Sequence, residues 1–204
     1  MDLSNRCVSN TVRYSAAYPT GAERFSSFPP KKSVRMVEAI GRYVALVAVV
    51  VAGCVTAPKV DNTPVATLDL NRYLGEWYEI ARFDHSFECG VEKCKANYVL
   101  RKDGGIDVVN TGVKDGKPKE ARGKAKKTDM PGLLRVSFFG PFYADYRVLM
   151  IDGDYSYALV GSGGADYLWI LSRTPSIGDA AKSALLAEAK RRGYDTSALI
   201  WVKQ

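Results

Sequence analysis

From Leu70 to Thr174, short runs of β-branched and aromatic residues alternate with short runs rich in Gly, Asp and Pro. The first kind of run predicts β-strands, and the second kind is typical of tight turns. All connections except the one at 84–93 are short enough to be hairpins. Successive antiparallel strands predict an all-β, up-and-down barrel, because closure leaves no exposed sheet edge. We expect eight strands, at Glu76–Phe83, Cys94–Arg101, Ile106–Val113, Glu120–Lys127, Leu133–Phe139, Asp145–Ile151, Ser156–Gly161 and Tyr167–Arg173.

Alternation within these strands indicates which face meets water. The second strand, CKANYVLR, places Cys, Ala, Tyr and Leu on one face and mainly polar residues on the other. The fourth strand, EARGKAKK, places Ala and Gly on one face and Glu, Arg and Lys on the other. Because the apolar face of a half-buried strand packs on the core, the charged faces must point outward. A barrel that spans an outer membrane has the reverse pattern, which excludes that class.

The inward residues of the fourth strand indicate what the barrel contains. Ala121, Gly123 and Ala125 are too small to fill the interior of eight strands, which can hold one small ligand. We therefore expect a cavity. Alternatively, these small residues face bulky partners across a packed core.

Beyond residue 175 the apolar period lengthens to that of a helix. Residues 179–192 form an amphipathic pattern, and we expect this helix to pack on the outer wall of the barrel. Ser176 is the expected N-cap, and Gly193 the residue after the helix end. A short final strand is expected at 198–202.

The N-terminal part is expected to be a targeting segment rather than part of a folded domain. Residues 43–52 form an uncharged apolar run, which suits a signal peptide better than a membrane-spanning helix of about 20 residues. The run ends in VAGC at 51–54, which resembles a bacterial lipobox. The resemblance implies that Cys54 carries acyl chains, and Val55 after it implies the outer membrane. An ordinary signal peptide or a short buried helix is the alternative.

These features divide the chain into four parts. Residues 1–35 are expected to be a non-native or disordered extension, because a signal peptide that began at Met1 would have far too long a basic region. A start at Met36 gives a compact signal peptide at 36–53. Residues 54–68 form a flexible linker, and residues 69–204 form the barrel domain.

Composition and charge are those of a folded globular chain. The formal net charge is +7, with 47% hydrophobic and 25% charged residues. Much of the excess lies in residues 1–53; the remaining 151 residues hold 22 basic and 19 acidic side chains. This balance does not favour nucleic-acid binding.

Three motifs resemble those of the lipocalin family. GEWY at 75–78 matches G-x-W-Y, ADY at 144–146 matches T-D-Y except at its first residue, and Arg173 matches the arginine that ends the eighth strand. The stretch 136–143 is similar to the bacterial outer-membrane branch, which is akin to apolipoprotein D. The resemblance spans Leu70 to Lys203 and implies a lipocalin calyx. Its structural residues are Gly75, Trp77, Asp145, Tyr146 and Arg173.

The motif residues are expected to stabilise the fold rather than contact ligand. Trp77 should close the floor of the barrel, with the Arg173 guanidinium over its indole. The family resemblance implies a fatty acid or a lysophospholipid as ligand. A hydroxyl near the mouth, that of Tyr98 or Tyr143, is expected to meet the head group. Core packing is the alternative role for each aromatic. Strand parity and the resemblance give the candidate ligand-binding residues as Tyr98, Val136, Phe138, Tyr157, Trp169 and Leu171.

The cysteines leave several hypotheses open. In an oxidising compartment Cys89 and Cys94 are candidates for a short-loop disulfide that fixes the loop between the first two strands, a lid in this fold. A metal site with His85 would lack a fourth ligand, so no metal is expected. A free Cys94 inside the calyx would instead allow a thiol-dependent isomerase, as in the lipocalin-type prostaglandin isomerase.

No other arrangement of residues points to catalysis, and no cofactor is expected. The sequence favours a noncatalytic lipid carrier or store, anchored to the outer membrane and facing the periplasm. A homodimer is compatible with this role. The alternatives are the isomerase that uses Cys94 and a structural envelope lipoprotein with a filled barrel.

Overall fold

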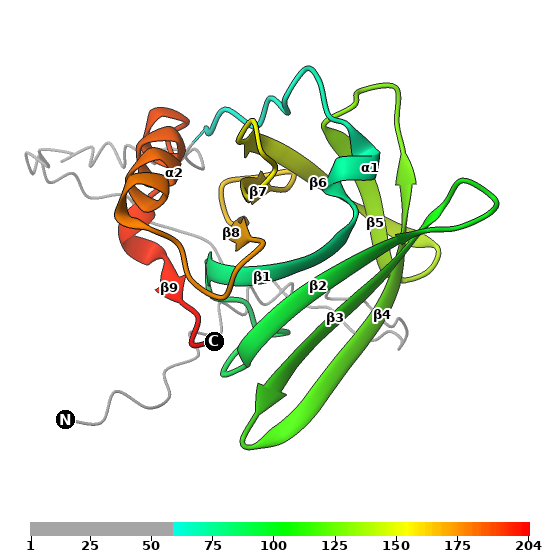
Figure 1. The fold of residues 1–204 in the computed structure, drawn as a ribbon, viewed down its shortest axis with the longest axis horizontal. Coiled ribbons are helices and arrows are strands. Elements are labelled where there is room, and N and C mark those ends of the chain that lie inside the picture. Colours follow the sequence, from blue (N-terminus) through cyan, green and yellow to red (C-terminus); the bar gives the residue numbers. More distant parts are fainter. Residues whose placement is uncertain (1–58) are drawn as a thin grey trace, which may run out of the picture. The chain divides into compact units, whose positions relative to one another are not determined.

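A computed structural model describes residues 59–204 (Figure 1). The expected extension, the signal peptide and Cys54 lie in residues 1–58, outside the described residues. Among the described residues, two clusters of hydrophobic side chains form the core. Residues 59–204 therefore have a core of their own.

One antiparallel sheet closes on itself, with neighbouring strands in chain order (Figure 1). β1 pairs with β2 on one side and with β8 on the other, which closes the eight strands into a barrel. β9 pairs with the last part of β1, outside the ring. The predicted all-β barrel is confirmed. The strands are β1 (Gly75–Arg82), β2 (Glu92–Leu100), β3 (Ile106–Lys114), β4 (Lys117–Lys127), β5 (Leu133–Phe139), β6 (Phe142–Ile151), β7 (Tyr157–Gly161), β8 (Leu168–Ser172) and β9 (Ile200–Trp201).

The strand directions define two ends of the barrel. The closed end holds the starts of β1, β3, β5 and β7 and a short helix, α1 (Leu70–Tyr73). α1 is attached there because Arg72 Nη2 donates to the main-chain oxygen of Gly153, in the turn between β6 and β7. The open end holds the other four connections, at residues 83–91, 115–116, 140–141 and 162–167.

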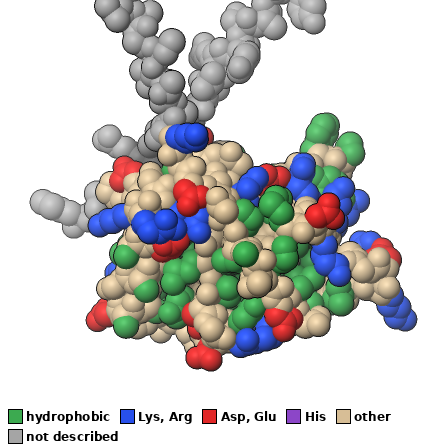
Figure 2. Space-filling view, turned by 90° about the horizontal axis from the view of Figure 1, so that it is seen from above, with side chains coloured by type: hydrophobic (Ala, Val, Ile, Leu, Met, Phe, Trp, Pro, Cys, Tyr) green, Lys and Arg blue, Asp and Glu red, His purple; other side chains and the backbone are tan. Residues whose placement is uncertain are grey.

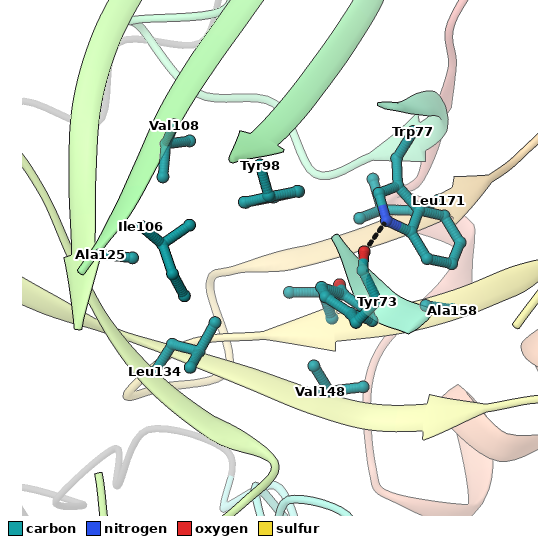
Figure 3. Packing of buried hydrophobic residues seen from close by; sticks show 11 residues of the cluster. Tyr73, Trp77, Tyr98, Ile106, Val108, Ala125, Leu134, Val148, Ala158 and Leu171 are labelled. Carbon is teal, nitrogen blue, oxygen red and sulfur yellow. Dashed lines mark hydrogen bonds between the residues drawn. The ribbon is translucent and has the colours of Figure 1, made fainter. Parts of the chain in front are cut away.

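Hydrophobic side chains pack on both faces of the sheet. The interior cluster includes Tyr73, Trp77, Ile106 and Leu134, which converge from α1 and several strands (Figure 3). The outer cluster covers β7 and β8 and includes Leu185.

The helix α2 (Asp179–Arg191) packs outside the barrel as expected, with Leu185 and Ala189 fully buried. Its N-cap is Gly178, without a side-chain hydrogen bond, so the expected cap at Ser176 is wrong. The helix begins two residues later than a Ser176 cap requires. Gly193 has φ +92° after the last turn, as expected for the residue that ends a helix. A one-turn 3₁₀ helix at Thr196–Ala198 leads to β9.

The segment 59–69 forms a strap along the outside of the barrel. It starts beside the end of α2, where the Asp61 amide donates to the main-chain oxygen of Arg192 at 2.8 Å. It ends at the closed end, where the Asp69 amide donates to the Tyr155 hydroxyl at 2.8 Å. Val65 and Leu68 of the strap pack against the interior cluster. The second half of the expected linker is therefore part of the fold.

The small residues of β4 do not all leave empty space. A Cβ built on Gly123 would lie 2.8 Å from the Phe138 ring, so the glycine makes room for that side chain. The packed-core alternative thus holds at this position.

Candidate ligand-binding site

The closed end is sealed by a tryptophan and an arginine. The Arg173 guanidinium lies 3.8 Å from the centroid of the Trp77 ring, as the sequence predicts. Arg173 also donates to five main-chain oxygens, those of Arg72, Tyr73, Leu74, Glu76 and Tyr155, at 2.7–3.3 Å. These bonds fix α1 against β1 and β8, so Arg173 connects three elements of the floor.

Gly75 allows this close packing. Its φ of +92° is a backbone conformation that residues with a Cβ rarely adopt. A Cβ there would make an ordinary van der Waals contact with the Arg173 guanidinium, at 3.5 Å, so the backbone angle rather than lack of space requires glycine. The Trp77 indole nitrogen donates to the main-chain oxygen of Tyr73 at 2.7 Å (Figure 3).

Three tyrosines form the next layer of the interior. The Tyr73 and Tyr146 hydroxyls lie 2.6 Å apart, and the Tyr98 hydroxyl donates to that of Tyr146 at 2.9 Å. Burial raises the pKa of Tyr98 to about 12 and those of Tyr73 and Tyr146 well above their usual value. The expected hydroxyl near the mouth is therefore wrong for Tyr98, whose β2 position pairs with Gly75 at the closed end.

Five of the six candidate lining residues belong to the interior cluster. Tyr98 and Leu171 are buried in it, and Val136, Phe138 and Trp169 pack against it. Tyr157 does not, because its neighbour Ala158 faces the interior and Tyr157 packs in the outer cluster. Tyr143 also fails as a polar group of the mouth, because its ring contacts Lys126 of β4, whose side chain is exposed.

A buried charged group lies toward the open end of the interior, and the sequence did not predict it. Arg82 is 2% exposed, and its Nη1 donates to the Glu79 carboxylate at 2.6 Å. Its Nη2 donates to the main-chain oxygens of Glu88 and Val91, at 2.7 and 3.1 Å. The Trp169 indole nitrogen donates to the Glu88 carboxylate at 3.3 Å. Because Trp169 packs against the interior cluster, this group forms part of the inner wall.

Burial controls the protonation of this group. Burial first, and the nearby Glu79 carboxylate second, raise the pKa of Glu88 to about 8. Burial also raises the pKa of Glu79, against the attraction of Arg82. Two carboxyl groups therefore share one guanidinium in an environment that disfavours both charges.

Two buried polar atoms of the inner wall have no hydrogen-bond partner in the part of the chain that the structure describes. One is Nε of Arg82, which lies 3.5 Å from the Glu88 carboxylate without a hydrogen-bond geometry. The other is Oδ1 of Asn110. Asn110 shares a face of β3 with Ile106 and Val108, which line the interior. The wall thus offers one donor and one acceptor.

Comparison with known proteins assigns the fold. The Lipocalin-like domain family matches residues 68–204. The chain belongs to the lipocalin family. It is 47% identical over 175 residues to the outer membrane lipoprotein Blc of Escherichia coli, covering 84% of this chain and 98% of that protein.

Two further proteins match a smaller share of the chain. Apolipoprotein D of Rattus norvegicus is 39% identical over 134 residues, covering 60% of this chain and 67% of that one. The solved structure of insecticyanin from the tobacco hornworm, 22% identical, superposes with a TM-score of 0.61 over 73% of this chain and 86% of that chain. That likeness supports the lipocalin fold.

Cys94 is a free, buried thiol in this lipocalin, so its expected disulfide with Cys89 is not formed. Its side chain points to the inner wall, where Sγ lies 3.7 Å from Nη1 of Arg82 and 3.4 Å from the main-chain oxygen of Val91. Burial, with Glu79 next, raises the pKa of Cys94 to about 12. A thiol in this state is a poor nucleophile at neutral pH.

Asp145, from the second lipocalin motif, has a structural position. Its carboxylate pairs with Arg135 and Arg147 at 3.2 and 2.7 Å, which links β5 to β6.

Among residues 59–204, no three metal-binding side chains gather closely enough to hold an ion. No helix in the same range has the length and apolar character needed to cross a bilayer.

Proposed function

We propose that this lipocalin binds a single-chain lipid, a fatty acid or a lysophospholipid, and carries or stores it at the bacterial outer membrane. Cys54 would carry the lipid anchor, with the barrel in the periplasm. The likeness to the outer membrane lipoprotein Blc over nearly its whole length supports this location.

The observation that carries the proposal is the mixed character of the inner wall. Most of it is apolar and aromatic, which suits an acyl chain. Two buried polar atoms of this wall, Nε of Arg82 and Oδ1 of Asn110, lack a hydrogen-bond partner among residues 59–204. Buried polar groups are normally hydrogen-bonded, so these atoms fit a ligand with a polar head.

The layout suggests an orientation for the ligand. Its head group would lie near Arg82 and Trp169, and its tail would pass Phe138 and Val136 toward Leu171 and Tyr98. The tyrosine layer and Trp77 limit how deep the tail reaches. Burial of the tail would contribute about 0.8 kcal/mol per methylene.

The proposed role is noncatalytic. The thiol of Cys94 is the one group suggested for catalysis, and its raised pKa keeps it protonated at neutral pH. The isomerase alternative would need the thiolate there.

Native mass spectrometry tests the carrier role. The chain from Val55 onward, purified without detergent, should show a mass above that of the protein, and solvent extraction should release a fatty acid or a lysophospholipid. Trp169→Ala should lose this ligand. Trp201→Ala is the matched control, because Trp201 is 43% exposed on β9, outside the barrel.

A different set of results would contradict the carrier role. A mass equal to that of the bare protein, with no change in tryptophan fluorescence on adding lysophospholipid or fatty acid, would favour a filled structural barrel. Loss of ligand in both tryptophan variants would place the binding outside the inner wall.

A further inference from the structure

The tip of the hairpin between β5 and β6 exposes two phenylalanines at the open end. Phe139 is 83% exposed and Phe142 is 78% exposed, the highest values among the large hydrophobic side chains that the structure describes. They flank the turn at Gly140 and Pro141. Phe87, 65% exposed, lies in another loop of the same end. Over most of the face seen in Figure 2, hydrophobic side chains are interspersed with charged ones.

A strongly basic strand lies beside this tip. β4 carries six Lys and Arg against one Glu, and nearly all of its residues are exposed. Residues 59–204 as a whole hold 22 basic and 19 acidic side chains, so outside β4 the described chain is net negative. The positive charge of the barrel is therefore concentrated on one strand.

Basic and aromatic side chains are in contact here. A Cβ built on Gly140, between the two phenylalanines, would lie 3.7 Å from Nζ of Lys124. Nζ of Lys126 lies 4.5 Å from the centroid of the Tyr143 ring. Lysine side chains that surround exposed aromatic rings are typical of surfaces that bind the interface of an anionic bilayer.

The strap starts near this same end, on the outside of the barrel. Nδ2 of Asn62 donates to the main-chain oxygen of Gly164, in the open-end loop between β7 and β8, at 3.4 Å. Cys54 precedes Asn62 by eight residues, a reach of at most about 28 Å. An anchor at Cys54, which belongs to the proposed function, would keep the open end close to the membrane.

We propose that the Phe139–Phe142 tip and the lysines of β4 dock the open end of the barrel onto a bilayer that contains anionic phospholipid. The phenylalanines insert among the lipid chains, and the lysines contact the phosphates. A second copy of this chain fits the surface less well, because a symmetric contact would bring two basic strands together. β4 pairs with β5 only from Lys124 onward, so its first part has a free edge, which lysines protect. This protection does not explain the exposed phenylalanines.

Vesicle co-sedimentation tests the proposal with the chain from Val55 onward, which has no anchor and folds around its own core. Vesicles of phosphatidylcholine with phosphatidylglycerol should bind the protein, and pure phosphatidylcholine should bind it at least about fivefold less, since each lysine near an anionic surface adds about fivefold in affinity. Removing the insertion with F139S/F142S should weaken binding about tenfold or more.

Matched variants distinguish binding through this surface from nonspecific adsorption to vesicles. M130S removes an exposed apolar side chain at the closed end and should leave binding unchanged. K119E/K124E should abolish the preference for anionic vesicles, whereas K102E/K190E, which makes the same charge change elsewhere on exposed positions, should lower it much less. Equal losses in test and control variants would overturn the proposal.

Two further outcomes are decisive. If wild-type protein ignores anionic vesicles but self-associates, and F139S/F142S sediments as a monomer, the surface binds a second copy and the bilayer proposal falls. Cargo is read separately by native mass spectrometry. Cargo without vesicle binding overturns only the docking surface, and vesicle binding without cargo overturns only the carrier role.

Discussion

Nη2 of Arg82 donates a 2.7 Å hydrogen bond to the main-chain oxygen of Glu88, so a buried guanidinium on the barrel wall holds the loop that crosses the open end. A second bond, to the main-chain oxygen of Val91, holds the other side of the same loop. The loop of residues 83–91 is therefore tied to β1 by one side chain.

Arg82→Ala should release this loop. It removes both carbonyl contacts and leaves the Glu79 carboxylate buried without its cation, a change that costs about 3–5 kcal/mol in other proteins. Hydrogen exchange should accelerate at the amides of residues 88–91, and urea denaturation should show the lower free energy of unfolding. Arg122→Ala, at an exposed arginine, is the control. Unchanged exchange in the loop would show that other contacts hold it.

Glu88→Gln should stabilise the protein in a pH-dependent way. The folded state raises the pKa of Glu88 from 4.5 to about 8, so it binds a proton that the unfolded chain releases between these values. Wild-type stability therefore falls as pH rises from 4.5 to 8, by at most about 1.4 kcal/mol per pH unit from this group, and levels off above 8. The glutamine variant lacks this fall.

Thermal unfolding of both proteins from pH 4 to pH 9 measures the difference. The advantage of Glu88→Gln should grow with pH up to 8, and Glu92→Gln controls for the loss of an exposed carboxylate. A constant difference across the range would contradict the raised pKa.

Arg173→Ala and Arg173→Lys should both weaken the floor. Alanine loses the stack on Trp77 and all five carbonyl contacts, and we expect a loss of about 3 kcal/mol or more. Lysine keeps the charge but not the planar fork, so its loss should be intermediate. Denaturant unfolding followed by tryptophan fluorescence measures both. A lysine variant as stable as wild type would mean that charge alone matters.

Native Cys94 should resist alkylation. Its thiol is buried, and its pKa of about 12 leaves very little thiolate at pH 8. Iodoacetamide followed by peptide mapping should label Cys94 only after unfolding in urea. Rapid labelling of the folded protein at this residue would revive the thiol-dependent isomerase.

Alternation along the strands was enough to predict the barrel and most of its inner wall. Period-two patterns depend only on which face meets water, and they placed Tyr98, Val136, Phe138, Trp169 and Leu171 correctly. They failed at Tyr157 because β7 is buried on both faces. One face points into the barrel, and the other packs in the outer cluster with α2. Where both faces are apolar, the sequence does not distinguish them.

The buried charged group shows a second limit. Strict alternation from Trp77 turns Glu79 inward but Arg82 outward. A register shift between Glu79 and Ala81 moves Arg82 onto the face of Glu79. Such a bulge depends on pairing with β8, which no local pattern reveals. Glu79, at an inward position, was the one available signal.

The strap has a mechanical consequence. A barrel anchored through residues that precede the strap is pulled through it, so the first bonds to carry load are those between Asp61 and Arg192 and then between Val65 and Val148. The strap crosses the barrel from the open end to the closed end, and peeling it would break these contacts in sequence before β1 is reached. Repeated pulling by the membrane would then detach and re-form the strap on the outside, while the floor at Trp77 and the interior cluster above it keep their packing.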